Sequence, residues 1–353
     1  MEKKSLKIAI IAPPFTTIPP KGHGGTERIV YEMVEGFKKR GHQVTLFGAG
    51  KCKTSAKFIQ IFKKTIEERK NNIDFIESFR PYRLETAYLS KIMEELIKKR
   101  QNFDVIFNHS KNNYLFLPLS HFVKLPIINI LHLPLFKEAE EFYSKFKNAN
   151  VVTVSNNQRK GFPKIRYLAT IYNGINTKKF QLTEKPKNYF LFLGAMGPHK
   201  NPKDAIMAAK KAGVKLILAG GKIRGPYFPE EIFPLIDGEK IRYIGEVRNE
   251  NIKINLLRNA KALLFPIKWP EPFGLVIIEA MACGTPVIAY ANGAIPEVIE
   301  NKKTGFIVKN VSEMVEAIKR IDEIDRRKCR EKVEKNFSVK KMVDEYEKIA
   351  FNS

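Results

Sequence analysis

The chain has 353 residues and a formal net charge of +25, from 62 Lys and Arg against 37 Asp and Glu, so it is long enough for two domains that each bury a core and basic enough to predict an anionic partner. A hydrophobic content of 44% with 28% charged residues excludes a disordered chain and a polytopic membrane protein, and no apolar run reaches the ~20 residues of a membrane helix. Three scattered cysteines and a short charged N-terminus without a cleavage-site pattern predict a cytoplasmic protein that has neither a disulfide framework nor a zinc site.

The first half of the chain alternates buried strands with helices. The apolar run at residues 6–12 predicts a buried parallel strand, and a glycine-rich loop at residues 21–25 follows it. A helix is expected from near Thr26, because apolar residues recur at helical spacing as far as Phe37 and Gly41 can end it. Further buried strands are predicted at residues 43–47, 103–108, 126–131 and 150–155.

Basic residues are densest between Lys51 and Arg100. Within this region, residues 57–64 place four apolar side chains beside three lysines, a basic-amphipathic pattern that favours docking on an anionic membrane. In the opposite interpretation, which the sequence leaves open, these apolar residues pack into the first domain and the lysines only keep the protein soluble. Nucleic acid is disfavoured as the partner, because no nucleic-acid-binding motif occurs and aromatic residues are not interleaved with the basic ones.

The second half begins after a polar linker at residues 178–187 and repeats the alternation. Asn201 as N-cap and Pro202 at the first helical position predict a helix over residues 202–212. A last helix over about residues 339–351 carries Met342, Tyr346 and Ile349 on one face, with which it could pack back on the first domain. The strands are predicted at residues 189–194, 214–219, 241–245, 262–266, 286–289 and 305–308.

This pattern predicts two doubly wound α/β domains that face a central cleft. Residues 1–181 form the first domain, to which the C-terminal helix at residues 337–353 returns, and residues 182–336 form the second. Such sheets bind ligands at the carboxyl ends of their strands.

The segment from Trp269 to Pro286 carries two carboxylates eight positions apart, Glu271 and Glu279. On a helix, eight residues span at most ~12 Å. That separation is too wide for carboxylates that share one proton or one water, and it suits the two ends of one extended polar ligand. The backbone amides of Phe273, Gly274 and Leu275, at the expected helix start, would offer unpaired donors to a phosphate between them.

This segment resembles the E-x7-E motif of the retaining glycosyltransferases of family 4, which have the GT-B fold of two Rossmann-like domains. The resemblance covers nearly the whole chain, and the number and order of the matching motifs make it specific. The other matches are residues 22–27 (glycine loop), 154–155, 173–175, 280–289, 292–293, 296–298 and 304–306.

The resemblance implies roles for residues of the second domain. Glu279 would accept hydrogen bonds from the ribose hydroxyls of a nucleotide sugar. Glu271 would contact the hydroxyls of the transferred sugar, helped by the amides of Phe273, Gly274 and Leu275. Lys200 would hold the diphosphate and neutralise the charge that grows as the bond to the anomeric carbon breaks.

In the first domain, the resemblance implies that the amides of Gly24 and Gly25 reach the same diphosphate and that His132 lies beside the donor sugar. Structural interpretations stay open for each of these residues. Gly24 and Gly25 could serve only a turn, and His132 could be a histidine at the core edge whose nitrogens bond the backbone. Glu271 could serve a rigid turn, whereas the apolar surroundings of Glu279 favour a partnered, functional carboxylate.

One position departs from the family pattern. Where the family usually has an arginine, this chain reads Gly194-Ala195-Met196, so a bidentate phosphate fork is missing there. Lys222 and Arg224 are the candidates to replace it. The alternative is a nucleotide-sugar-binding protein with weak or no catalysis.

The resemblance therefore implies a metal-independent hexosyltransferase without a cofactor, which retains the anomeric configuration. No Asp-x-Asp motif and no metal-ligand spacing occurs in the sequence. UDP-hexose is the preferred donor and GDP-mannose the second. A glycan, a lipid-linked precursor or a small molecule would be the acceptor, and a cytoplasmic enzyme could contact the inner face of the membrane peripherally.

Overall fold

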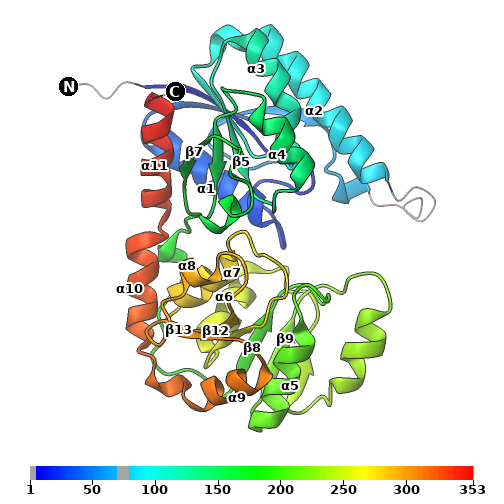
Figure 1. Cartoon of the computed structure of the whole chain (residues 1–353), viewed down its shortest axis with the longest axis vertical. Helices are drawn as coiled ribbons and strands as arrows, with labels where there is room; N and C mark the ends of the chain where they lie inside the picture. Colours follow the sequence, from blue (N-terminus) through cyan, green and yellow to red (C-terminus); the bar gives the residue numbers. More distant parts are fainter. Residues whose placement is uncertain (1–4, 70–78, 353) are drawn as a thin grey trace. The chain divides into compact units, whose positions relative to one another are not determined.

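A computed structural model describes residues 5–69 and 79–352 of the chain (Figure 1). It divides into two compact units, which are Met1–Gly174 with Val339–Ser353, and Ile175–Ser338. The division comes before Ile175, earlier than the boundary expected after residue 181. The Ile175 amide donates to the Phe337 carbonyl at 2.9 Å and Ile175 forms a bridge with Ser338, so this stretch is tied to the end of the second unit.

The first unit is built on a seven-stranded parallel sheet of order β3-β2-β1-β4-β5-β6-β7. Its central strands are the continuous apolar runs of the sequence, as expected for a sheet covered on both faces. The strands are β1 (Lys7–Ile11), β2 (Gln43–Ala49), β3 (Lys57–Phe62), β4 (Val105–Asn108), β5 (Ile127–Leu131), β6 (Val151–Thr153) and β7 (Tyr167–Thr170).

The C-terminal helix α11 (Val339–Phe351) packs on α1 (Gly25–Lys39) within the first unit (Figure 1). Both helices bury the predicted apolar faces, including Phe37 and Tyr346. Glu347 accepts from the Arg40 guanidinium at 2.7 Å and lies 2.9 Å from His42 Nε2, so a charged network reinforces the contact. The prediction for the last helix is confirmed. The other helices of this unit are α2 (Arg80–Lys99), α3 (Leu117–Val123) and α4 (Lys137–Ser144).

Strands β3 and β7 at the two edges of this sheet were not predicted. Strand β3 occupies the stretch with the basic-amphipathic pattern and pairs with β2. Phe62 is buried, and Ile59 and Ile61 pack against the same core, whereas the three lysines are exposed. This is the packing expected if the apolar residues belong to the core of the first domain and the lysines only keep the protein soluble. Residues 70–78 of the basic region lie outside the described residues. The apolar residues in question are Phe58, Ile59, Ile61 and Phe62, and the lysines are Lys57, Lys63 and Lys64.

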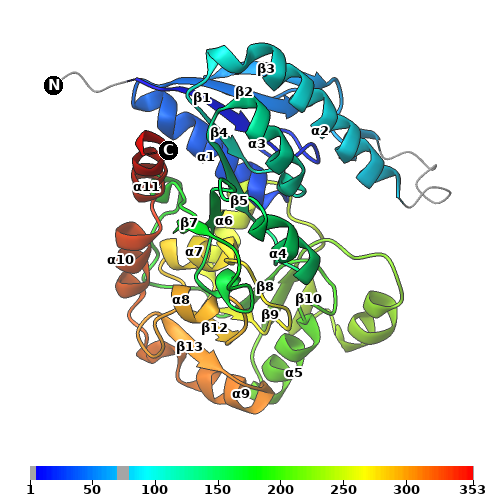
Figure 2. The ribbon, with the colours of Figure 1, turned by 45° about the horizontal axis from the view of Figure 1, so that its top comes forward.

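The second unit contains a six-stranded parallel sheet of order β10-β9-β8-β11-β12-β13. Strands β8, β9, β10, β12 and β13 of this sheet are labelled in Figure 2. All six strands were predicted within a few residues. They are β8 (Phe190–Leu193), β9 (Leu216–Ala219), β10 (Ile241–Tyr243), β11 (Leu263–Phe265), β12 (Val287–Tyr290) and β13 (Gly305–Val308). The helices are α5 (Pro202–Ala212), α6 (Glu250–Asn259), α7 (Leu275–Ala282), α8 (Ile295–Val298), α9 (Val311–Lys319) and α10 (Arg326–Asn336).

The strand order of the second sheet reverses between β8 and β11. From β8 the chain proceeds to β9 and β10 on one side, and from β11 to β12 and β13 on the other. The loops after β8 and β11 therefore leave adjacent strands in opposite directions, which is where open α/β sheets bind ligands. Lys200 follows β8 and Glu271 follows β11.

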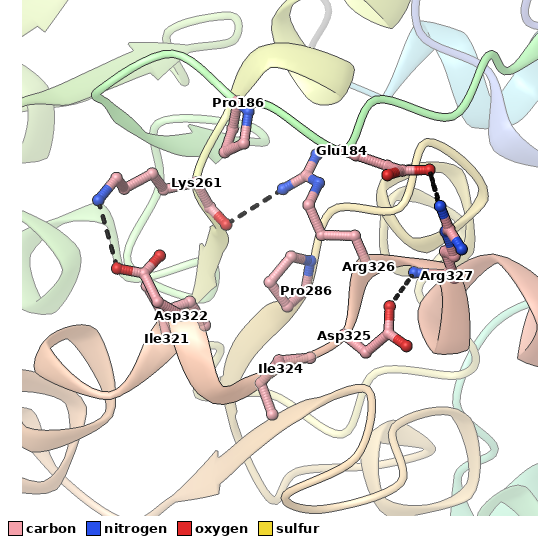
Figure 3. A pocket seen from close by; sticks show the side chains of 10 residues that line it. All are labelled: Glu184, Pro186, Lys261, Pro286, Ile321, Asp322, Ile324, Asp325, Arg326 and Arg327. Atoms are coloured by element: carbon pink, nitrogen blue, oxygen red, sulfur yellow. Dashed lines mark hydrogen bonds and ion pairs between the residues drawn. The ribbon is translucent and has the colours of Figure 1, made fainter.

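A cavity of about 280 Å³ lies at the amino ends of β11 and β12, opposite that edge (Figure 3). The Arg326 guanidinium fills part of it and donates to the carbonyls of Arg258 (2.9 Å) and Ala260 (3.0 Å) and to Thr285 Oγ1 (2.8 Å). Lys261 pairs with Asp322 at 3.6 Å beside it. These contacts fasten the start of α10 to the sheet, so we interpret this cavity as structural.

Two histidines lie at the carboxyl edge of the first sheet, where His109 follows β4 and His132 follows β5. His109 Nδ1 is 2.9 Å from His132 Nε2, and the two rings stack with centroids 5.1 Å apart. Burial lowers the pKa of His132 to about 4 and holds the pKa of His109 well below its usual range. Both imidazoles are therefore neutral at pH 7, with one nitrogen donating to the other.

This pair predicts an acid-dependent loss of stability. Because the folded pKa values lie below the unfolded value near 6.5, the unfolded chain takes up protons first as the pH falls from 6.5 towards 4. Each such histidine then lowers the free energy of unfolding by up to about 1.4 kcal/mol per pH unit. Thermal melts between pH 7.5 and 4.5 should show a steeper fall for the wild type than for His132→Gln. Equal slopes would contradict the assignment.

Candidate functional site

The loops after β8 and β11 bring Lys200 and Glu271 into contact. Lys200 Nζ lies 2.5 Å from Glu271 Oε2, and the two side chains are only 19% and 12% exposed. Trp269 Nε1 donates to the same oxygen at 2.8 Å, and the Lys200 ammonium lies 5.0 Å from the centre of the indole ring. Both predicted residues thus share one site, while their mutual pairing and the role of Trp269 were not predicted. The site combines a cation, a carboxylate and an aromatic face.

The backbone of Glu271 is held by the loop after β12. Gly293 has a φ of +65°, and a Cβ there would lie 2.2 Å from the Glu271 carbonyl oxygen. The Ala294 amide donates to that carbonyl at 2.9 Å, and Asn292 Nδ2 donates to the Ile267 carbonyl at 2.6 Å. A glycine at 293 is therefore required for the loop to approach Glu271 this closely, which gives the Asn292-Gly293 match a physical reason.

Glu279, on α7, is paired as well. Its Oε1 lies 2.6 Å from Nζ of Lys253 on α6, and the side chains are 5% and 13% exposed. The prediction that this carboxylate needs a partner in its apolar surroundings is confirmed, but the partner was missed. Lys253 belongs to no motif and lies on an ordinary amphipathic helix, so only the packing of α6 against α7 identifies it.

The start of α7 lies between the two carboxylates along the chain. Gly274 is the N-cap residue, with a φ of +86° in the left-handed region and no side-chain capping bond. Phe273 buries its ring against Phe337, with centroids 5.7 Å apart, and Leu275 is half-buried. The first amides of a helix lack partners within the helix and carry its positive end. This geometry can hold an anionic oxygen.

Lys222 lies beside the position of the missing arginine. Its backbone forms a bridge with Met196, and the Met196 amide donates to the Gly221 carbonyl at 2.8 Å. The Lys222 ammonium rests on aromatic rings, 4.5 Å from the centre of Phe228 and 5.6 Å from that of Tyr243. Lys222 is exposed. Its bridge to Met196 places it close to Ala195, the position at which the family usually has an arginine.

The first unit places its predicted residues at the carboxyl edges of β1 and β5. Gly24 precedes α1 with a φ of +121°, and a Cβ there would lie 2.9 Å from Pro20 and 3.1 Å from Glu27 Oε2. Gly25 is exposed. His132 is held by His109 in the pair described above. Burial raises the pKa of the Glu27 carboxyl beside this loop.

Two kinds of feature are absent from residues 5–69 and 79–352. No cluster of three or more His, Cys, Asp or Glu in these residues could hold a metal ion. None of the described helices combines the length and the apolar character needed to cross a membrane.

Known proteins resemble this chain along most of its length. A family model described as "Glycosyltransferase Family 4" matches residues 23–179, and one described as "Glycosyl transferases group 1" matches residues 175–337. An uncharacterised glycosyltransferase of Methanocaldococcus jannaschii is 25% identical, over 86% of this chain and 85% of its own.

Solved structures show the same fold. Sucrose-phosphate synthase of Thermosynechococcus elongatus has a TM-score of 0.76 at 19% identity, over 98% of both chains. HepE of Anabaena, solved with UDP and glucose, has a TM-score of 0.74 at 16% identity, over 99% of this chain and 100% of its own. Because the two family models together match residues 23–337 and the fold is that of the GT-B glycosyltransferases, the chain belongs to the group 1 glycosyl transferases of the family 4 type.

Proposed function

We propose that this chain transfers a hexose from a nucleotide sugar to a glycan, lipid-linked or small-molecule acceptor, with retention of anomeric configuration. The observation that carries the proposal is the arrangement in the second unit. Two glutamates flank the start of α7 along one segment, and each is paired with a lysine from another element. UDP-hexose is the preferred donor, because HepE was solved with UDP and glucose. GDP-mannose is the second candidate.

In this proposal different residues of the second unit contact different parts of the nucleotide sugar. Glu279 accepts from the ribose hydroxyls, the α7 amides and Lys200 contact the diphosphate, and Glu271 contacts the sugar. Since Lys200 and Glu271 already touch, the diphosphate and the sugar hydroxyls would enter next to an existing ion pair. His132, Gly24 and Gly25 remain proposed donor contacts on the resemblance alone.

The chemical step then needs little from a general base. The bond between the anomeric carbon and the diphosphate oxygen breaks, and its electron pair stays on that oxygen. The acceptor hydroxyl attacks the same face and gives its proton to the leaving diphosphate, so the configuration is retained. Lys200 and the α7 amides stabilise the growing negative charge, and the protein otherwise positions the reactants. We propose that this cation and these amides suffice without a divalent ion.

The missing arginine motivates a second candidate, a protein that binds nucleotide sugars but transfers them weakly or not at all. Lys222 supports retained binding, because its backbone lies next to Met196 and its side chain is exposed. A single ammonium cannot supply the two parallel hydrogen bonds of a guanidinium, so orientation of the diphosphate would suffer first. Measured binding without transfer would favour this candidate.

A thermal-shift panel tests the donor. UDP-glucose, UDP-galactose and GDP-mannose are each added in EDTA, with glucose and mannose as controls. A donor at 100 times its Kd stabilises the folded protein by about 2.7 kcal/mol, so we expect UDP-glucose to raise Tm by several degrees and the free sugars to leave it unchanged. If no nucleotide sugar raises Tm either in EDTA or in magnesium, the proposed function fails. A shift that EDTA abolishes and magnesium restores would contradict metal independence.

Lys200→Ala tests the charge-stabilising role. Removing a group that stabilises developing charge costs about 100-fold or more in kcat, and we expect donor affinity to fall much less, because the charge is smaller in the ground state. Lys203→Ala is the matched control, since Lys203 pairs with Glu231 at 3.0 Å on the exposed side of α5. Equal losses in kcat and affinity would show that Lys200 is only an anchor.

A membrane-resident acceptor is the proposal that the basic region supports. Because Phe62 is buried and Ile59 and Ile61 pack against the same core, the candidates are the most exposed apolar side chains described in this region. These are Phe79 and Tyr82 at the start of α2, which are 71% and 64% exposed. Phe79 is followed directly by Arg80, and Tyr82 is followed directly by Arg83. Aromatic residues beside basic ones suit an anionic interface, and each engaged basic residue contributes about 1 kcal/mol.

Vesicle sedimentation tests this docking. We expect the protein to pellet with phosphatidylserine-containing vesicles at low salt and to stay in solution with phosphatidylcholine alone. Phe79→Ser with Tyr82→Ser should weaken pelleting, whereas Ile252→Ser, which changes a 53% exposed side chain in the second unit, should not. Wild-type protein that stays in the supernatant with anionic vesicles would make a soluble acceptor the better proposal.

A further inference from the structure

The ion pair of Lys253 and Glu279 is the feature of the site that the motifs do not explain. The E-x7-E segment supplies the glutamate, but the lysine comes from α6, and no motif quoted above includes it. The pair is among the least exposed of the described ion pairs, with the two side chains 13% and 5% exposed. Because the pair is buried at a proposed ligand contact, the lysine needs an explanation of its own.

The two oxygens of Glu279 are used differently. Oε1 takes the Lys253 ammonium at 2.6 Å. No described residue donates to Oε2. This oxygen is also not one of the fully buried side-chain atoms that lack a hydrogen-bond partner, so it keeps some contact with solvent. One oxygen is thus fixed by the protein, and the other remains open to a donor from outside.

We propose that Lys253 is a positioning residue for the nucleoside part of the donor, which fixes Glu279 so that Oε2 meets the ribose hydroxyls. This inference rests on the proposed function, because it assigns the partner of a proposed donor contact. A carboxylate buried to this extent without a cation would be neutralised or would turn towards another donor. With Oε1 engaged, Oε2 still has two lone pairs and can accept from two vicinal hydroxyls. Lys253 therefore makes the site selective for nucleotides with both ribose hydroxyls.

A purely structural role explains the pair less well. The end of α6 is already tied to the turn after α7, since Thr285 Oγ1 donates to the Leu257 carbonyl at 2.7 Å. Buried ion pairs also add little net stability compared with apolar residues of the same volume. A link that only joined α6 to α7 would not need an ion pair beside an open carboxylate oxygen.

The test measures selectivity for the ribose. Calorimetric titration gives the Kd of UDP, GDP and their 2′,3′-dideoxy analogues. The variants are then measured with the nucleobase, uracil or guanine, whose diphosphate binds the wild type more tightly. For the wild type we expect the dideoxy analogue to bind about tenfold or more weakly, as for the loss of hydrogen bonds to a charged acceptor. In Lys253→Met the ribonucleotide should weaken about tenfold while the dideoxy analogue changes little, so that the selectivity disappears. Lys253→Arg should retain most of it.

Two further variants keep the inference open to refutation. Lys261→Met is the matched control, since Lys261 pairs with Asp322 at the opposite edge of the same sheet, and it should keep wild-type selectivity. If Lys253→Met does not fold, Lys253→Met with Glu279→Gln removes the unpaired charge. Compared with Glu279→Gln alone, it should show no further loss of ribonucleotide affinity.

The outcomes separate the inference from the function on which it rests. If wild-type protein binds no nucleoside diphosphate and no nucleotide sugar, the proposed function fails. If it binds them but Lys253→Met keeps the ribose selectivity, the inference is wrong. Equal weakening of the ribonucleotide and the dideoxy analogue would also overturn it, because Lys253 would then contact the ligand directly.

Discussion

The second unit depends on one physical constraint, which is that a buried carboxylate requires a cation. Glu271 and Glu279 both lie in the apolar segment around α7, and each is paired with a lysine from another element. Lys200 comes from the loop after β8 and Lys253 from α6. The parallel order that sets β8 beside β11 brings the first lysine to its partner, and the packing of α6 on α7 brings the second. The same strand order and helix packing that form this unit therefore also neutralise the two buried carboxylates of its site.

Backbone contacts fix the same region more tightly than charge alone could. Gly293 approaches the Glu271 carbonyl so closely that any side chain would collide with it. Gly220 approaches the Gly194 carbonyl in the same way, where a Cβ would lie 1.8 Å from the oxygen, and this closes the ends of β8 and β9 onto each other. The contact at Gly293 sets the backbone position of Glu271, so Lys200 pairs with a carboxylate whose main chain is already fixed.

The sequence predicted the elements that are long, apolar or clearly punctuated, such as α5 and α11, whose bounds match. It missed β3 and β7, because these edge strands are partly exposed, and in β3 Gln60 interrupts the apolar residues. Asn201 takes the predicted N-cap position, but its side chain donates to the Pro266 carbonyl at 2.9 Å instead of capping α5. The resemblance implied the site residues that lie in its motifs, such as Lys200 and Glu271. Lys253 could not be predicted, since its role depends on which helix packs next to α7.

The departure at Ala195 fits this view of the site. The Lys222 ammonium lies on the faces of Phe228 and Tyr243, and an exposed cation–π contact contributes only about 0.5–1 kcal/mol. A charge-assisted hydrogen bond to a phosphate is stronger than that, so moving the lysine to a diphosphate would be favourable. A flexible ammonium cannot reproduce the two fixed hydrogen bonds of a guanidinium, however. On the proposed function, Ala195 should therefore affect how well the leaving diphosphate is oriented more than how tightly the donor binds.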